Sequence, residues 1–248
     1  MKGRFMTRAL FLLLLLQAVP IPSRADEHAG KVVIGQISLS FYAVTAGIVR
    51  EVLERLGHTV ETVQGSHAQI FPRLGAGEID ALVAAWLPHG HAIYWERYGE
   101  QAQALCVLYE NARFVWMVPD YVPAAVVAQV DDLTKPEVRS RMNTVIQGTG
   151  RDSGNMIDYI HRAGTMRPIA EPRKLLREPN AGTLVASRAW IERAPEKTLR
   201  VLRRMHLGMD AVEEMDEQVN RAGTSAQQAA REWVERNQSI VDGWFEQP

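Results

Sequence analysis

The stretch that decides the fold is residues 31–63, KVVIGQISLSFYAVTAGIVREVLERLGHTVETV. It opens with a β-branched run over residues 31–37, which is typical of a strand. Residues 43–56 follow with apolar side chains at the spacing of one helix face, and Gly57 stands where a left-handed cap is expected. Residues 58–63 then alternate apolar and polar side chains as a half-buried strand does. This order predicts a parallel β-α-β unit.

The same alternation continues to about residue 118. We expect helices at 68–74 and 90–98, and strands at 79–84, 104–108 and 113–118. A candidate crossover at 119–132 leads to a short strand at 144–147, a Gly-rich turn and a helix at 155–163. The fold class predicted from this pattern is α/β, with a mostly parallel sheet and helices on both faces.

The last third of the chain lacks the strand-helix alternation of the residues before it. Residues 183–245 show no convincing strand, and helical segments are expected near 183–193, 196–206, 210–221 and 225–237, with a short tail at 240–245. We therefore divide the chain into a 26–120 N-terminal α/β lobe, a 121–182 reduced second α/β lobe with the crossover, and a 183–248 C-terminal helical segment.

The first 25 residues read as a secretory signal peptide. A basic start with Lys2, Arg4 and Arg8 precedes a short apolar core, and the small-x-small site 23–25 follows. The apolar core is shorter than the roughly 20 residues that span a bilayer. No Cys follows the cleavage site, so we expect a periplasmic protein without a lipid anchor.

Composition excludes several classes of protein. The chain has 248 residues, 46% hydrophobic and 23% charged, which excludes a wholly disordered chain. The single Cys106 excludes an internal disulfide and a Cys-rich zinc site. Removing residues 1–25 takes four of the 28 basic residues and none of the 29 acidic ones, which leaves a charge of −5. We therefore expect no nucleic-acid partner.

The turn after the third expected strand carries the most chemistry. It runs Trp86-Leu87-Pro88-His89-Gly90-His91 and leads into Tyr94-Trp95-Glu96-Arg97-Tyr98. Ligands of open α/β sheets bind beyond the carboxyl ends of the strands, where this turn is expected. The face of a Trp ring attracts organic cations. We interpret Trp86 and His91 as ligand-binding residues, and the three later aromatic residues as the core face of the next helix.

This turn resembles the compatible-solute binding proteins of ABC importers, the glycine betaine, proline betaine and choline class. Gly77-Glu78-Ile79-Asp80 followed by the Trp86–His91 turn matches the family's pattern of Gly-x-x-Asp, apolar residues and Trp-Leu-Pro-x-x-His. Asp152-Ser153-Gly154-Asn155-Met156 is similar to the family's Gly-Ser-Gly-x-Met. The resemblance covers residues 31–163 well and 195–245 loosely. It implies a two-lobed type II periplasmic-binding-protein-like fold with a helical C-terminal layer.

The resemblance also implies the function. The chain would be an extracytoplasmic substrate-binding protein that captures a quaternary amine or zwitterion and delivers it to an ABC permease and ATPase complex at the inner membrane. A quaternary ammonium donates no hydrogen bond, so aromatic faces hold it, and Trp86 matches one of the family's box tryptophans. His91 matches the carboxylate-contacting histidine, and the turn with Ser153, Gly154 and Asn155 matches the donors at a helix start.

Two departures from the family pattern stand out. Leu39 occupies the place of the family's first box tryptophan, and Phe41 and Tyr42 are the nearby candidates to replace it. The Trp-x-Pro-His-Trp segment of the family's second lobe has no counterpart, which predicts a shortened second lobe. These departures leave open a degenerate paralogue that binds a different small carboxylate or a protein partner.

The remaining constellations are weaker. His67, His89, His91 and Asp80 together suggest a periplasmic metal-binding protein as a further alternative, since imidazole and carboxylate suit zinc. No nucleophile stands in a G-x-S-x-G setting, so we expect neither an enzyme nor a cofactor.

Overall fold

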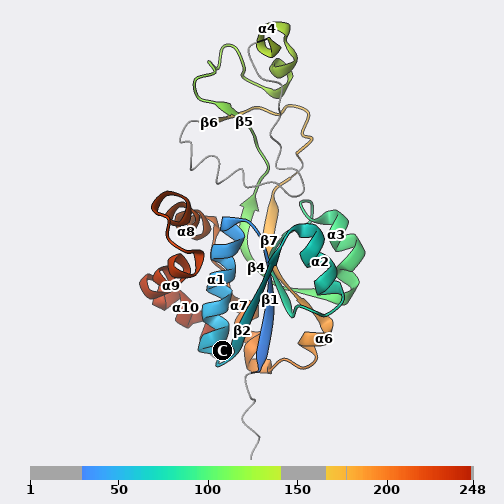
Figure 1. Ribbon diagram of the computed structural model, residues 1–248, viewed down its shortest axis with the longest axis vertical. Helices are drawn as coiled ribbons and strands as arrows, with labels where there is room; N and C mark the ends of the chain where they lie inside the picture. Colours follow the sequence, from blue (N-terminus) through green and yellow to red (C-terminus); the bar gives the residue numbers. More distant parts are fainter. Residues whose placement is uncertain (1–29, 141–165, 177, 247–248) are drawn as a thin grey trace, which may run out of the picture.

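The computed structural model describes residues 30–140, 166–176 and 178–246, and its centre is a five-stranded sheet (Figure 1). The strands are β1 (Lys31–Ile37), β2 (Thr59–Gly65), β3 (Ala81–Leu87), β4 (Ala102–Ala112) and β7 (Asn180–Ser187), in the order β2-β1-β3-β7-β4. β1 is parallel to β2 and to β3, whereas β7 is antiparallel to both of its neighbours. The sheet is therefore mixed rather than mostly parallel.

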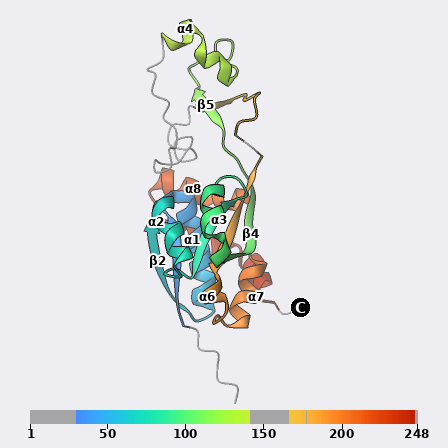
Figure 2. The same ribbon diagram turned by 90° about the vertical axis from the view of Figure 1, so that its right-hand side faces the viewer.

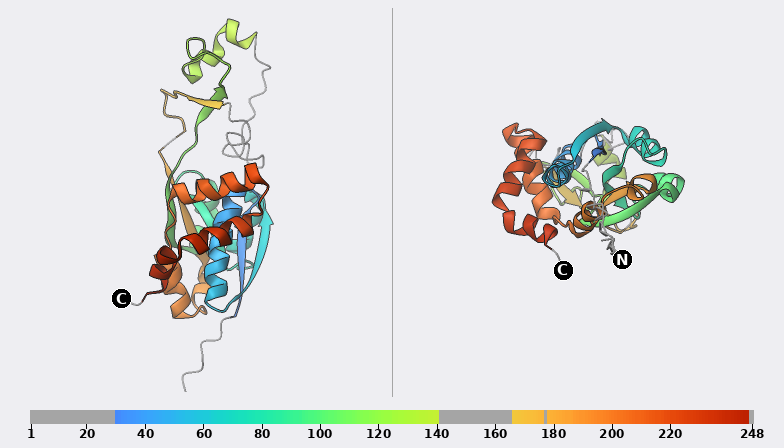
Figure 3. Two further views of the ribbon diagram at one scale, coloured as in Figure 1. Left: turned by 90° about the vertical axis from the view of Figure 1, so that its left-hand side faces the viewer. Right: turned by 90° about the horizontal axis from the view of Figure 1, so that it is seen from below.

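Helices cover both faces of this sheet (Figures 1 and 3). One face carries α1 (Ser40–Arg55), α8 (Met209–Ala222), α9 (Ala226–Arg236) and α10 (Gln238–Phe245), and the other carries α2 (His67–Gly75) and α3 (Ala92–Tyr98). α6 (Arg188–Ile191) follows β7, the 3-10 turn η1 (Gly99–Gln101) follows α3, and α7 (Glu196–Arg204) packs against β4. α1 and α9 approach closely at Gly47, where an added Cβ would lie 2.6 Å from the Cβ of Ala230.

A second, smaller part lies beyond one end of the sheet (Figures 1 and 2). It contains the antiparallel pair β5 (Trp116–Pro119) and β6 (Met166–Ile169), the 3-10 turn η2 (Val130–Thr134) and α4 (Pro136–Arg139). Its own small core consists of Val118, Val122, Val127, Val138 and Ile169. Residues 113–115, 170–176, 178 and 179 lie between this part and the sheet. This arrangement confirms the expected two-lobed α/β fold.

The largest error of the sequence interpretation concerns β7. The expected helix over 183–193 is wrong for residues 183–187, which complete a strand between β3 and β4. Residues 181–187 are mostly apolar because both faces of this strand are covered, so they lack the alternation that marks a half-buried strand. The helices expected at 196–206, 210–221 and 225–237 are confirmed as α7, α8 and α9. The strand expected at 144–147 and the helix at 155–163 lie outside the described residues.

Candidate functional site

One edge of the sheet gathers aromatic and polar side chains from β3, β4 and β7 and from the helices and turns beside them. β3 ends at Leu87 opposite Ala181, and β4 ends at Ala112 opposite Asn180, so the carboxyl ends of β3 and β4 meet the start of β7. β1 and β2 are parallel to β3 and end on the same side. The side chains gathered there are Phe41, Tyr42, His67, Trp86, His91, Tyr109, Phe114 and Asn180. This is the edge at which open α/β sheets bind ligands.

The turn from Trp86 to His91 closes on itself. The Trp86 N–H donates to Nδ1 of His91 at 2.8 Å, and the His91 N–H donates to the Trp86 carbonyl at 2.9 Å. Gly90 makes this closure possible, because an added Cβ there would lie 2.9 Å from the Cβ of Trp86. From the start of β7, Oδ1 of Asn180 accepts the N–H groups of His89 and Gly90, both at 2.8 Å. The turn is therefore fixed by its own ends and by a strand about 90 residues away.

The hydrogen bonds of His91 define which ring nitrogen carries its proton. Because Nδ1 accepts the Trp86 N–H, the neutral ring carries its proton on Nε2, which donates to Oη of Tyr42 at 3.4 Å. Burial, with a smaller contribution from His67, lowers the pKa of His91 from 6.5 to about 3. The ring of His67 lies 4.8 Å from that of His91. His91 is consequently a neutral donor at ordinary pH.

A bulge in β3 sets the position of the Trp86 indole. The register of β3 against β7 shifts between Leu82 and Ala85, and Ala84 has a positive φ of 61°. Bulges of this kind re-aim the side chains that follow. The Trp86 Nε1–H donates to Oη of Tyr109 on β4 at 2.9 Å. Gly182 of β7 lies opposite both residues and leaves room for the Tyr109 ring, since an added Cβ would meet that ring at 2.2–2.5 Å.

Three further rings surround the Trp86 indole. The centroids of Phe41, Tyr42 and Phe114 lie 5.5, 6.4 and 5.3 Å from that of Trp86. Trp86 is only 7% exposed, whereas Phe114 is 40% exposed. The exposed aromatic surface at this edge therefore belongs to Phe114.

The structure brings together four of the residues chosen from the sequence. Trp86, His91, Phe41 and Tyr42 form one cluster, while the predicted donors Ser153, Gly154 and Asn155 lie outside the described residues. Leu39 is the N-cap of α1, directly before the two aromatic residues.

Tyr109, Phe114 and Asn180 also belong to this edge but were not predicted from the sequence. Their aromatic and amide character was visible in the sequence, but no motif joins them to the turn. Tyr94, Trp95 and Tyr98 of α3 pack against the core, as expected.

Asp80 lies too far from the three histidines to share a metal site with them. Asp80 lies at the start of β3, at the opposite end from His91, where its Oδ2 accepts the Val33 N–H at 2.7 Å and its Oδ1 pairs with Arg193. Within residues 30–140, 166–176 and 178–246, no group of three or more His, Cys, Asp or Glu side chains could hold a metal ion.

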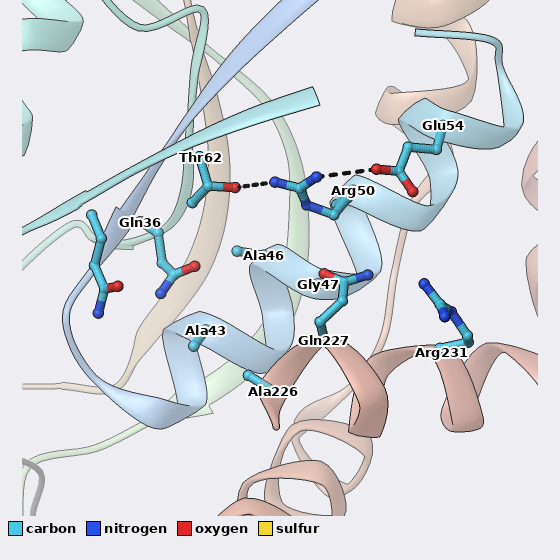
Figure 4. A pocket seen from close by; sticks show the side chains of 11 residues that line it. Gln36, Ala43, Ala46, Gly47, Arg50, Glu54, Thr62, Ala226, Gln227 and Arg231 are labelled. Carbon is cyan, nitrogen blue, oxygen red and sulfur yellow. Dashed lines mark hydrogen bonds and ion pairs between the residues drawn. The ribbon is translucent and has the colours of Figure 1, made fainter. Parts of the chain in front are cut away.

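A separate polar hollow of about 570 Å³ lies between α1, α9 and the β1–β2 edge (Figure 4). It is lined by Gln36, Ala43, Ala46, Gly47, Arg50, Glu54, Thr62, Gln64, Ala226, Gln227 and Arg231. Arg50 donates to Thr62 at 2.7 Å and pairs with Glu54 at 3.1 Å. The lining contains no aromatic ring and two cationic side chains. This hollow is therefore poorly suited to a quaternary ammonium.

Among the residues that the structure describes, no helix has the length and apolar character needed to cross a membrane.

Comparisons with known proteins identify the family of the chain. The family model OpuAC, the substrate-binding domain of ABC-type glycine betaine transport systems, matches residues 30–163 and 158–236. No curated protein sequence matches the chain.

Solved structures share the fold. Lactococcal OpuAC in complex with glycine betaine superposes with a TM-score of 0.69 at 16% identity, over 88% of this chain and 100% of that one. The glycine betaine/L-proline-binding protein ProX from Borrelia burgdorferi gives 0.69 at 14% identity, over 88% and 97% of the two chains. An ABC-transporter choline-binding protein in complex with choline gives 0.68 at 12% identity, over 87% and 91%.

Proposed function

Because the chain belongs to the family of substrate-binding domains of ABC-type glycine betaine transport systems, we propose that the edge built around Trp86 and His91 is its solute site. The family makes the chain a substrate-binding protein for ABC import of compatible solutes, which acts outside the cytoplasm. This agrees with the resemblance found in the sequence. The family is a transport family, and the proposed role requires binding and release rather than catalysis.

The ligand that we propose is a small zwitterion or quaternary amine such as glycine betaine or choline. The observation that carries this proposal is the ring cluster beside a neutral histidine donor. Phe114 presents an exposed ring beside the largely buried indole of Trp86, and the face of such a ring attracts a methylated ammonium by about 0.5–2 kcal/mol. Tyr42, whose hydroxyl oxygen accepts the Nε2–H of His91, is proposed to donate its own hydrogen to the oxygen end of the ligand, and Ser153, Gly154 and Asn155 are proposed to complete it. The aromatic end and the polar end thus match the two ends of a betaine.

The cellular setting belongs to the same proposal. Residues 1–25 are proposed to direct export and to be cleaved, so that the mature chain is periplasmic and free of a lipid anchor. The partners are a membrane permease and its ATPase, to which closure of the two lobes on the solute would present the cargo. No role for nucleic acid enters this scheme.

Titration calorimetry with glycine betaine, choline and carnitine tests the solute site. We expect saturable one-to-one binding of at least one of them, and a loss of tenfold or more in Trp86→Ala. The exposed Tyr121, 84% accessible and located after β5, serves as a control in Tyr121→Ala, which should bind as the unmodified chain does. Silence across the whole panel would refute the proposal and favour the degenerate paralogue.

A further inference from the structure

The polar hollow beside α1 (Figure 4) has no part in the function proposed above, and it shares no residue with the edge built around Trp86 and His91. Its volume of about 570 Å³ lies within the range of small-molecule sites, roughly 300–1,000 Å³. The composition and the bonding of its lining decide which ligand it suits.

The sheet side of the hollow carries two amide side chains. Gln36 and Gln64 are register partners on the parallel strands β1 and β2, so their side chains lie next to each other on one face. Ile34, two residues earlier on the same face of β1, is buried. Within the described part of the chain, neither amide group makes a hydrogen bond, and both line the hollow. Each amide thus keeps two N–H donors and a carbonyl acceptor for a ligand.

The helix side leaves room because its side chains are small. Ala43, Ala46 and Gly47 of α1 line the hollow together with Ala226 of α9. Residues three and four apart lie on one face of a helix, so longer side chains at these positions would fill the space. Small residues on one helix face, opposite amide side chains on two strands, therefore form the hollow.

The charged side chains of the lining still offer both a donor and an acceptor. Arg50 is occupied, because it donates to Thr62 at 2.7 Å and to Oε1 of Glu54 at 3.1 Å. Oε2 of Glu54 accepts no hydrogen bond from a residue that the structure describes. Arg231, 59% exposed, reaches Glu51 through Nε at 3.4 Å, which leaves its two Nη groups as donors among the described residues.

We propose that this hollow binds a free amino acid, a zwitterion whose ammonium group keeps its N–H bonds. The Nη groups of Arg231 and the amide N–H groups of Gln36 and Gln64 suit the carboxylate of such a ligand. The Glu54 carboxylate and the amide carbonyls suit its N–H donors. The described lining has no aromatic ring, so it offers no face for a methylated nitrogen. Its preference is the reverse of that proposed for the edge at Trp86.

Glycine and its N-methylated series test this inference in the full chain. Heteronuclear NMR follows the side-chain NH₂ signals of Gln36 and Gln64, which Gln36→Glu and Gln64→Glu assign. We expect both signals to shift saturably with glycine, at a Kd of about 1 mM or tighter. Sarcosine, dimethylglycine and glycine betaine lose N–H donors one by one. The Kd at the hollow should therefore rise along the series, by about tenfold or more from glycine to glycine betaine.

Arg231→Gln and Arg236→Gln form a matched pair on α9. Both arginines are exposed and paired with a glutamate, but only Arg231 lines the hollow. Arg231→Gln should weaken glycine binding about 3- to 30-fold, whereas Arg236→Gln should leave the Kd within about twofold. Ala43→Leu fills the hollow and should abolish the shifts. A thermal melt of each variant confirms that it folds, and the arginine pair decides if Ala43→Leu does not.

Failure of this inference is distinct from failure of the proposed function. A chain that binds no betaine at Trp86 can still show saturable shifts at Gln36 and Gln64, and these would support the inference. It is wrong if glycine shifts neither signal saturably, or if glycine betaine binds the hollow as tightly as glycine does. It is also wrong if Arg231→Gln and Arg236→Gln bind glycine equally well.

Discussion

Gly182→Ala tests whether the packing of three neighbouring strands positions the indole. Gly182 lies on β7 between Trp86 of β3 and Tyr109 of β4. An added Cβ would approach Cζ of Tyr109 to 2.2 Å and both Cε atoms to 2.5 Å, distances at which an atom must move. Tyr109 is fully buried, so its ring has little room to yield. Overpacking of this kind costs about 1–3 kcal/mol, and loss of the Trp86–Tyr109 hydrogen bond adds about 1 kcal/mol.

The expected destabilisation is thus about 2–4 kcal/mol, or roughly 4–16 °C in Tm for a chain of this size. Thermal and urea unfolding followed by circular dichroism measure it. Gly243→Ala is the matched control, because Gly243 lies in helix α10 and an added Cβ meets nothing within 4 Å. That control should be neutral or slightly stabilising.

A double variant identifies the cause of the change. Tyr109→Leu removes the ring that the new methyl group strikes, so Gly182→Ala should cost much less in that background than in the unmodified chain. An unchanged Tm in Gly182→Ala, or equal costs in both backgrounds, would falsify the packing argument.

Four further substitutions have expected outcomes. Asp80→Ala should cost about 1–3 kcal/mol in urea unfolding, because it leaves the Val33 N–H without its acceptor. Arg193→Ala removes the ion-pair partner of Asp80, whose side chain is 60% exposed, and should lower the free energy of unfolding by less than about 1 kcal/mol. Equal losses in Asp80→Ala and Arg193→Ala would contradict the larger role given to the hydrogen bond from Val33. Burial holds the folded-state pKa of His91 at about 3, below 6.5. Unfolding therefore takes up a proton between these values, and stability falls as the pH drops from about 6.5 towards 3, by up to about 1.4 kcal/mol per pH unit. His91→Gln should flatten this dependence between pH 7 and pH 5, and an unaltered slope would show that His91 is not the group concerned. Asn180→Ala should lower the solute affinity measured by titration calorimetry, because the N–H groups of His89 and Gly90 lose their shared acceptor. An unchanged affinity would show that these hydrogen bonds do not position the solute site.

The sequence predicted the elements whose periodicity is set by one buried face. α9 buries Ala229, Ala230 and Trp233 on one side, at the helical spacing. β7 was missed because burial on both faces removes the alternation and leaves a run that also suits a helix. Its pairing partners on β3 and β4 lie about 70–100 residues earlier, a distance over which local patterns carry no information.

The residues of the candidate site also include some that the sequence could predict and some that it could not. Trp86 and His91 were predictable because one short turn holds both and the two residues bond to each other. Phe114 follows a strand whose register against β7 shifts three times, so the direction of its side chain could not be read by counting. Asn180 contacts the turn from 91 residues later in the chain, and only the fold reveals that contact.

The closed turn also explains why a histidine is useful at position 91. A lysine or arginine there would carry its charge towards the ring cluster and repel the quaternary ammonium that is proposed to bind there. His91 is held neutral by burial, and the Trp86 N–H occupies Nδ1, so the remaining proton must stand on Nε2. That proton is donated to Tyr42, which leaves the Tyr42 hydroxyl hydrogen available for an oxygen of the ligand. The pair of His91 and Tyr42 can therefore offer the Tyr42 hydroxyl as a hydrogen-bond donor without placing a cation beside the amine, which is what the proposed site for a zwitterion requires.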